Sequence, residues 1–131
     1  ELESLVNIKG LGKMIIFLGA KLNPYIWMRN AELFILSSKF EGFGLVLVEA
    51  MTVGTFVISS NCKVGPQEIL HNGICGDLFE VGDTEELSRI IINALTNKCY
   101  KQNRIDRASK SILKYDKSIS TKKLLTILNS K

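Results

Sequence analysis

The sequence lacks several features that would point to particular functions. It has one histidine, His71, and three cysteines, Cys62, Cys75 and Cys99. Gaps of 13 and 24 positions separate the cysteines, so neither a zinc knuckle nor, with an odd count, a disulfide framework is expected. No Ser or Cys motif accompanies the histidine. A catalytic triad and a histidine-rich metal site are therefore not expected either.

Long apolar runs are also absent. No stretch approaches the roughly 20 apolar residues that cross a bilayer, and the N-terminus carries no secretion signal. With 131 residues, of which 46% are hydrophobic and 23% charged, the composition predicts one globular domain at most. The expected location is the cytoplasm. Because residue 1 is Glu and the first methionine is Met14, we expect the chain to be a piece of a longer protein.

Charge is distributed unevenly along the chain. Residues 1–97 hold 7 Lys and Arg against 11 Asp and Glu, whereas residues 98–131 hold 10 against 2. The basic stretch fits a solvated amphipathic helix or contact with an anionic surface, either phospholipid or an acidic domain. Its only aromatic residues are Tyr100 and Tyr115, so nucleic-acid binding is not expected.

Apolar runs alternate with helical patterns. The runs at 14–19 (MIIFLG), 33–38 (LFILSS), 55–60 (TFVISS) and 77–81 (DLFEV) predict strands. Helices are predicted at 2–10, at 25–31 after the Asn23-Pro24 start signal, at 65–70, after the capping pair Asp83 and Glu86, and from Asn103 onwards. Short strands that alternate with helices predict an α/β domain with a parallel sheet.

The stretch EGFGLVLVEAM (41–51) follows the end of a predicted strand. Ligands of open α/β sheets bind outside the carboxyl ends of the strands. Gly42 and Gly44 match two glycines of the dinucleotide fingerprint, but Leu47 takes the third place, the later acidic residue is absent, and no G-K-[ST] follows. A glycine-rich turn into a helix still presents free N–H groups, which favours a phosphate.

Two carboxylates bracket this turn, Glu41 before the glycines and Glu49 one turn into the helix. A carboxylate repels a phosphate, so we interpret both as acceptors of hydrogen bonds from neutral hydroxyls. The phosphates would lie over the N–H groups of Gly44, Leu45 and Val46. The resulting order of hydroxyls, phosphates and hydroxyls is that of a sugar, a diphosphate and a ribose.

E-G-F-G-L-V-L-V-E closely resembles the E-x7-E motif of glycosyltransferase family 4, whose members are retaining enzymes with the GT-B fold. The flanking sequence resembles the family as well, from NPYIWMRNAELFILSS before the motif to GPQEIL and GDLFEVGD after it, over about residues 2–97. The GPQEIL variant looks like that of bacterial enzymes that build lipopolysaccharide, capsule or lipid-linked oligosaccharide.

The resemblance implies a function and a site. The chain would be the donor-binding part of a retaining glycosyltransferase, inactive by itself, whose donor is a nucleotide-diphosphate sugar with uridine as the first expectation and guanosine as the next. No metal or other cofactor is implied. Glu41 would be the catalytic residue and hold the donor sugar, and Glu49 would hold the ribose. The donor-binding residues would be Glu41, Gly42, Phe43, Gly44, Leu45, Val46 and Glu49; Gly19, Ala20 and Lys21 would lie near the nucleobase.

The resemblance also implies what the chain lacks. Family members have an N-terminal acceptor domain, and their C-terminal domain begins two strands earlier, with an Arg and a Lys that neutralise the diphosphate. Lys39 and Lys63 are the local candidates for that role. In the family's strand order 3-2-1-4-5-6 the missing strands are central, between 14–19 and 33–38. We therefore expect a Rossmann-like C-terminal half-domain over residues 1–131, with a basic helical tail at about 98–131, that is unstable, rearranged or completed by another chain.

Two other functions stay open. The chain would alternatively be a non-catalytic nucleotide-sugar-binding chain, or a relic, that needs a partner polypeptide. A sugar-nucleotide epimerase is a weaker third reading, because the sequence shows no additional acid/base cluster. For a transferase, the acceptor would be a cell-surface glycan or a lipid-linked sugar, and the basic tail suggests peripheral contact with the inner face of the plasma membrane.

Overall fold

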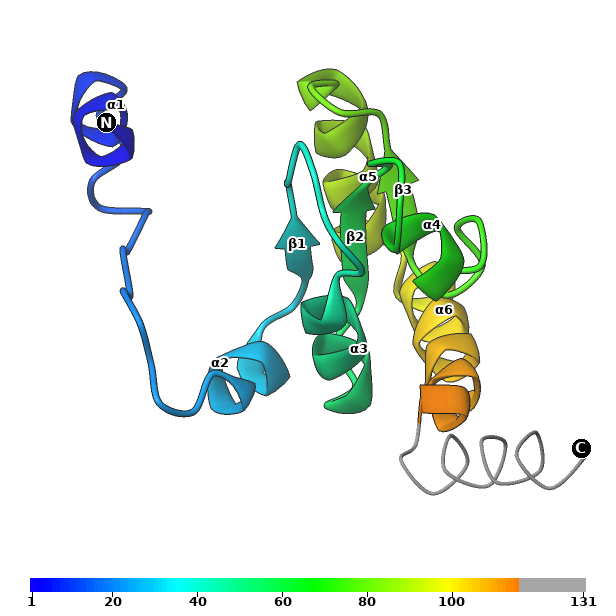
Figure 1. The fold of residues 1–131 in the computed structure, drawn as a ribbon. Coiled ribbons are helices and arrows are strands. Elements are labelled where there is room, and N and C mark those ends of the chain that lie inside the picture. The colour runs from blue at the N-terminus through cyan, green and yellow to red at the C-terminus, as the bar shows by residue number, and fades with distance from the viewer. Residues whose placement is uncertain (116–131) are drawn as a thin grey trace, which may run out of the picture.

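A parallel sheet of three strands forms the centre of the computed structural model, which describes residues 1–115 (Figure 1). The strands are β1 (Phe34–Leu36), β2 (Val57–Ser60) and β3 (Asp77–Phe79), in that spatial order. Ile58 of β2 pairs with Ile35 on one side and with Asp77 on the other. All of β2 is buried because it is the central strand. The expected α/β fold with a parallel sheet is confirmed, and three of the predicted strands are present with narrower bounds.

Helices cover both faces of this sheet. They are α3 (Leu45–Thr52), α4 (Pro66–Ile69), α5 (Thr84–Thr96) and α6 (Lys98–Ser111), followed by a 3-10 turn at Ile112–Tyr115. Val57 packs with residues of α3 and α4, whereas its neighbours Phe56 and Ile58 pack with α5. Because side chains alternate along a strand, one buried strand supplies the core on both sides.

Side-chain caps mark where α5 and α6 begin. The Asp83 carboxylate accepts a hydrogen bond from the Glu86 N–H at 2.8 Å, which confirms the predicted start of α5. Asn97 caps α6 in the same way, accepting from the Tyr100 N–H at 3.0 Å. The expected start of this last helix near Asn103 is therefore wrong, because the helix begins more than one turn earlier, at Lys98. Of the basic tail, residues 116–131 lie outside the described residues.

An N-terminal arm lies beside the sheet without joining it (Figure 1). It consists of α1 (Leu2–Ile8), an extended stretch, and α2 (Tyr25–Asn30), which packs on α3. The predicted strand at 14–19 is wrong for the described structure: no residue there is in a strand, and Met14 and Ile16 are about four-fifths exposed. A strand requires a hydrogen-bonded neighbour, and among residues 1–115 β1 pairs only with β2.

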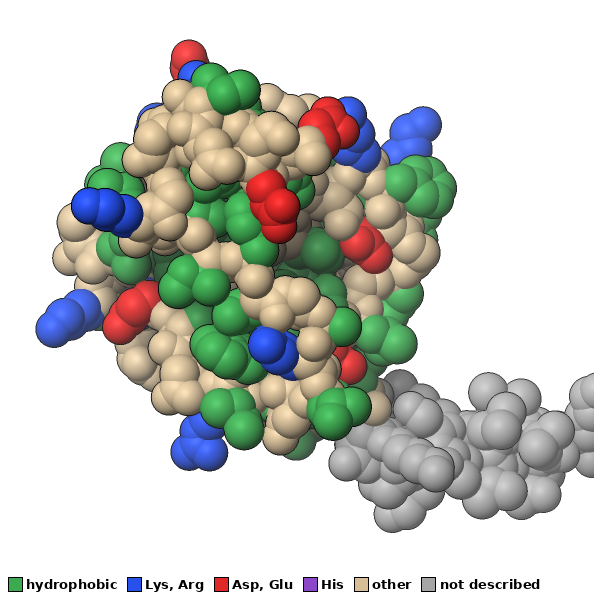
Figure 2. Space-filling model, turned by 90° about the vertical axis from the view of Figure 1, so that its left-hand side faces the viewer, with side chains coloured by type: hydrophobic (Ala, Val, Ile, Leu, Met, Phe, Trp, Pro, Cys, Tyr) green, Lys and Arg blue, Asp and Glu red, His purple; other side chains and the backbone are tan. Residues whose placement is uncertain are grey.

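The outer edge of β1 therefore has no strand beside it in the described part of the chain. Figure 2 looks onto the side that carries the arm, where hydrophobic side chains gather around a hollow. A hollow of about 630 Å³ lies between the arm and β1, lined by Leu18, Trp27, Met28, Phe34 and others. That further strands complete this edge stays a prediction.

Hydrogen exchange distinguishes the arm from the sheet. We expect the backbone amides of residues 16–18 to exchange almost as fast as in an unfolded chain, because no strand covers them, and those of Ile58 and Ser59 to be the most protected. NMR-detected exchange of the 131-residue chain measures both groups in one sample. Equal protection of the two groups would show that the arm finds a pairing partner in solution.

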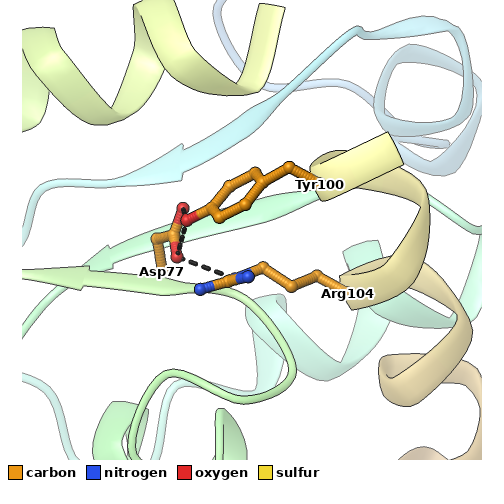
Figure 3. A network of polar contacts seen from close by, with 3 residues as sticks. All are labelled: Asp77, Tyr100 and Arg104. Carbon is orange, nitrogen blue, oxygen red and sulfur yellow. Dashed lines mark hydrogen bonds and ion pairs between the residues drawn. The ribbon is translucent and has the colours of Figure 1, made fainter. Parts of the chain in front are cut away.

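A buried carboxylate joins α6 to the sheet (Figure 3). The Tyr100 hydroxyl donates to Asp77 Oδ1 and Oδ2 at 2.8 and 2.7 Å, and Arg104 Nε donates to Oδ1 at 2.9 Å. The Arg104 guanidinium also lies 3.9 Å from the centre of the Tyr100 ring. Burial, and then the bond to Asp77, raises the pKa of Tyr100 to about 12. We call this group the Asp77 cluster.

Candidate functional site

Two loops leave the carboxyl ends of β1 and β2 and meet above the sheet. The β1–α3 loop covers residues 37–44, and the β2–α4 loop covers residues 61–65. Ser60 at the end of β2 is buried, and its hydroxyl donates to the Ser38 carbonyl oxygen at 2.5 Å. Asn61 donates to the Glu80 carboxylate at 2.9 Å. Polar residues at the strand ends thus hold the two loops in position.

Glu41 lies in the β1–α3 loop, where a serine orients it. The Ser38 hydroxyl donates to Glu41 Oε1 at 2.6 Å, and both side chains are half-buried. Because both residues belong to the β1–α3 loop, this hydrogen bond stabilises the conformation of the loop. Glu41 Oε2 receives no hydrogen bond from residues 1–115, so this oxygen has its full capacity to accept from a ligand hydroxyl.

Gly44 begins α3 in the left-handed conformation, with φ of 86°. No side chain caps this helix, and the Leu47 N–H already bonds to the Gly44 carbonyl oxygen at 2.9 Å. The N–H groups of Leu45 and Val46 precede the first intrahelical bonds, as at every helix N-terminus. The turn therefore has the uncapped donors and positive dipole end that suit an anion.

Gly65 brings the second loop against the first. Its φ is +89°, and a Cβ built there would lie 1.9 Å from the Phe43 carbonyl oxygen. Phe43 in turn packs edge-on against Tyr115, with ring centres 5.9 Å apart. Only glycine permits this approach, so the conformation of the 41–46 loop depends on a residue about twenty positions away. Sequence reasoning missed this contact; GPQEIL identified the segment, but not what its glycine touches.

Glu49 lies on α3 and has a partner on α2. The Tyr25 hydroxyl donates to Glu49 Oε1 at 3.4 Å. Beside the pair lies a hollow of about 270 Å³ lined by Tyr25, Leu45, Val48, Glu49, Thr52 and Val53. Sequence reasoning missed Tyr25 as well, because nothing in the spacing connects it with Glu49.

Two of the residues expected near the nucleobase line a different hollow from the one beside Glu49. Gly19 and Lys21 line the larger hollow between the arm and β1, not the one beside Glu49. Lys39 and Lys63 are exposed on the two loops. Their assignment to nucleobase and diphosphate stays a prediction. Among residues 1–115, no group of three or more His, Cys, Asp or Glu is arranged to hold a metal ion, and no helix combines the length and apolarity that a membrane span requires.

The parallel sheet, its flanking helices and the glycine-led helix start define a Rossmann-like α/β domain. Residues 1–111 match the family model described as glycosyl transferases group 1. The chain belongs to this family, which confirms the resemblance carried by the E-x7-E motif.

Three known proteins show how far the similarity extends. An N-acetylgalactosamine-N,N'-diacetylbacillosaminyl-diphospho-undecaprenol 4-alpha-N-acetylgalactosaminyltransferase of Campylobacter jejuni is 30% identical over 112 residues, which cover 82% of this chain and 31% of that protein. The crystal structure of HepE from Anabaena in complex with UDP superposes with a TM-score of 0.91 at 25% identity, over 99% of this chain and 36% of that one.

The third is the C-terminal domain of the group 1 family protein LpcC from Francisella tularensis, with a TM-score of 0.74 at 24% identity over 88% of this chain and 61% of that one. The fold is therefore that of a GT-B C-terminal domain. The chain spans between 12% and 31% of the length of eight of the curated relatives that it matches.

Proposed function

We propose that this chain is the donor-binding part of a retaining glycosyltransferase that moves a sugar from a nucleotide-diphosphate sugar to a glycan or lipid-linked acceptor. The observation that carries the proposal is the arrangement around α3: an uncapped helix N-terminus with Glu41 before it and Glu49 one turn after it. A UDP complex of a structural neighbour and a diphospho-undecaprenol substrate in a relative's name support the donor and acceptor classes.

Each part of the site has a chemical task in this reaction. The diphosphate would lie over the Leu45 and Val46 N–H groups, where the helix dipole stabilises the charge that grows on the leaving diphosphate. Glu41, which the hydrogen bond from the Ser38 hydroxyl orients, would accept hydrogen bonds from hydroxyls of the transferred sugar. Glu49 would accept from the ribose hydroxyls. The proposal includes no metal: the backbone donors, with Lys39 and Lys63 as the candidate cations, would meet the developing charge.

A second candidate is a binding chain that becomes active only with a partner polypeptide. The free edge of β1 and the exposed arm favour it, since both leave apolar surface uncovered. Both candidates require nucleotide binding. They differ in what transfer to an acceptor requires: the first candidate needs the missing segment and the acceptor domain of the same protein, and the second needs a separate partner polypeptide.

Thermal unfolding of the 131-residue chain tests the shared part of both candidates. We expect UDP at millimolar concentration to raise the Tm, with GDP and ADP as the comparison nucleotides. A ligand at 100 times its Kd adds about 2.7 kcal/mol to the free energy of unfolding. UDP-glucose tests the sugar half of the site, because any rise in Tm greater than that with UDP depends on contacts to the sugar.

Two variants separate the halves of the site. Glu49→Gln should reduce the rise in Tm that UDP causes. Glu41→Gln should leave that rise unchanged and remove the additional rise in Tm that UDP-glucose causes. Glu85→Gln on the exposed first turn of α5 is the control. The proposal is wrong if no nucleotide raises the Tm of the folded chain, or if both variants behave as the control does.

A further inference from the structure

Glu49 receives a hydrogen bond from an element far from it in sequence. Within residues 1–115 the only side chain that donates to its carboxylate is Tyr25, 24 positions earlier, at 3.4 Å. The Glu49 side chain is half-buried, and Tyr25 is exposed. A carboxylate that must receive ligand hydroxyls gains from such a bond, because the bond restricts the rotation of a long side chain.

The position of Tyr25 is itself set by several contacts. Tyr25 is the first residue of α2, and its N–H donates to Asn23 Oδ1 at 3.2 Å. On the buried side of the same helix, Met28 packs in the core cluster that includes α3 residues. The Met28 carbonyl oxygen also accepts from the buried Thr55 hydroxyl at 2.6 Å. Tyr25 therefore reaches Glu49 from a helix that is held at both its start and its middle.

The space beside the pair suits part of a ligand. The hollow next to Tyr25 and Glu49 measures about 270 Å³, below the roughly 300 Å³ at which pockets for whole small molecules begin. Leu45 and Val48 supply apolar walls, and the Glu49 carboxylate supplies the acceptor. A single polar ring with adjacent hydroxyls, such as a ribose, matches this size and chemistry.

We propose that Tyr25 is a positioning residue that holds the Glu49 carboxylate for the donor's ribose. It acts through Glu49 and thereby contributes to the preference for a ribose over a ring without hydroxyls. Each Glu49 oxygen keeps a lone pair for a ribose hydroxyl after Oε1 has accepted the hydrogen bond from the Tyr25 hydroxyl. This inference rests on the proposed donor-binding function and assigns a task to a residue outside the E-x7-E motif.

Calorimetric titration of the full 131-residue chain tests the inference. The probes are UDP and 2',3'-dideoxy-UDP, which lacks both ribose hydroxyls. Tyr25→Phe removes only the hydroxyl. We expect it to weaken the binding of UDP roughly three- to tenfold, while the affinity for the dideoxy probe stays the same. In a Glu49→Ala background, Tyr25→Phe should have no further effect, because its partner is already gone.

A matched control is Thr96→Val, which removes a hydroxyl that bonds to the Ile92 carbonyl oxygen on α5, far from the site. Equal weakening of both probes by Tyr25→Phe would overturn the inference, as would a full additional effect in the Glu49→Ala background. Unchanged UDP affinity in Tyr25→Phe would overturn it and leave the proposed function intact. If the wild-type chain binds none of UDP, GDP and ADP, the proposed function fails and the inference fails with it.

Discussion

Replacing Gly65 with alanine is expected to lower the free energy of unfolding by at least about 3 kcal/mol. Two effects combine at this position. The backbone conformation, with φ of +89°, is one that residues with a side chain rarely adopt, and the new Cβ would lie 1.9 Å from the Phe43 carbonyl oxygen. Because that neighbour is backbone, relief requires one of the two loops to move. Urea unfolding at pH 7 measures the change.

Two other glycines separate the effects. Gly82 has a φ of +90° with nothing within 4 Å of a built Cβ, so Gly82→Ala carries the backbone strain alone, about 1–2 kcal/mol. Gly42 has open space and no positive φ, and Gly42→Ala should change stability by less than about 0.5 kcal/mol. If Gly65→Ala is no worse than Gly82→Ala, the two loops do not touch in solution.

The functional consequence of Gly65→Ala follows from where Phe43 lies. Phe43 belongs to the loop that carries Glu41 and leads into the N-terminus of α3. Moving its carbonyl displaces the donors proposed for the diphosphate. We expect the folded fraction of this variant to lose the UDP-induced rise in Tm, while Gly82→Ala, outside the proposed binding loop, keeps it.

Removing the carboxylate of the Asp77 cluster is expected to have the second large effect on the free energy of unfolding. Asp77→Ala should lower the free energy of unfolding by about 3 kcal/mol, since breaking a buried ion pair leaves its partners without compensation. Asp77 is 6% exposed and accepts from both Tyr100 and Arg104. Asp106→Ala on the exposed face of α6 is the control. Equal urea midpoints for the two variants would show that α6 does not depend on this cluster.

Alkaline pH gives an independent view of the same cluster. The folded-state pKa of Tyr100, about 12, exceeds the unfolded value of 10.0. The associated stability is therefore fully present below pH 10 and is lost as the pH rises from 10 to 12. Tyr100→Phe should lack this part of the alkaline loss. A wild type and a Tyr100→Phe variant with parallel stability curves over that range would contradict the assignment.

Local chemistry in the sequence predicted much of this structure. The runs LFILSS, TFVISS and DLFEV contain β1, β2 and β3, because an apolar run of this length between turn residues suits a strand that is buried on both faces. The Asp83 cap was recognisable from its spacing to Glu86. Both motif carboxylates were placed correctly on the chain, Glu41 in a loop and Glu49 within a helix.

Other expectations needed information that no local pattern carries. MIIFLG has the composition of a strand, yet a strand exists only with a hydrogen-bonded neighbour, and in the described part of the chain this segment pairs with no strand. The start of α6 was expected too late because Asn97 was not considered as a cap and Tyr100 faces the sheet in its first turn.

The sequence by itself determined the class of this protein, since strand-like runs, helix caps and the E-x7-E motif depend on residues close together in the chain. Only the tertiary structure decided what orients the two glutamates and what limits their loop. Ser38 lies near Glu41 in sequence, but Tyr25 reaches Glu49 across 24 positions, and Gly65 meets Phe43 with α3 and β2 between them in the chain. Such contacts arise from the packing of whole elements against one another, and packing depends on shape in three dimensions, which local spacing does not encode.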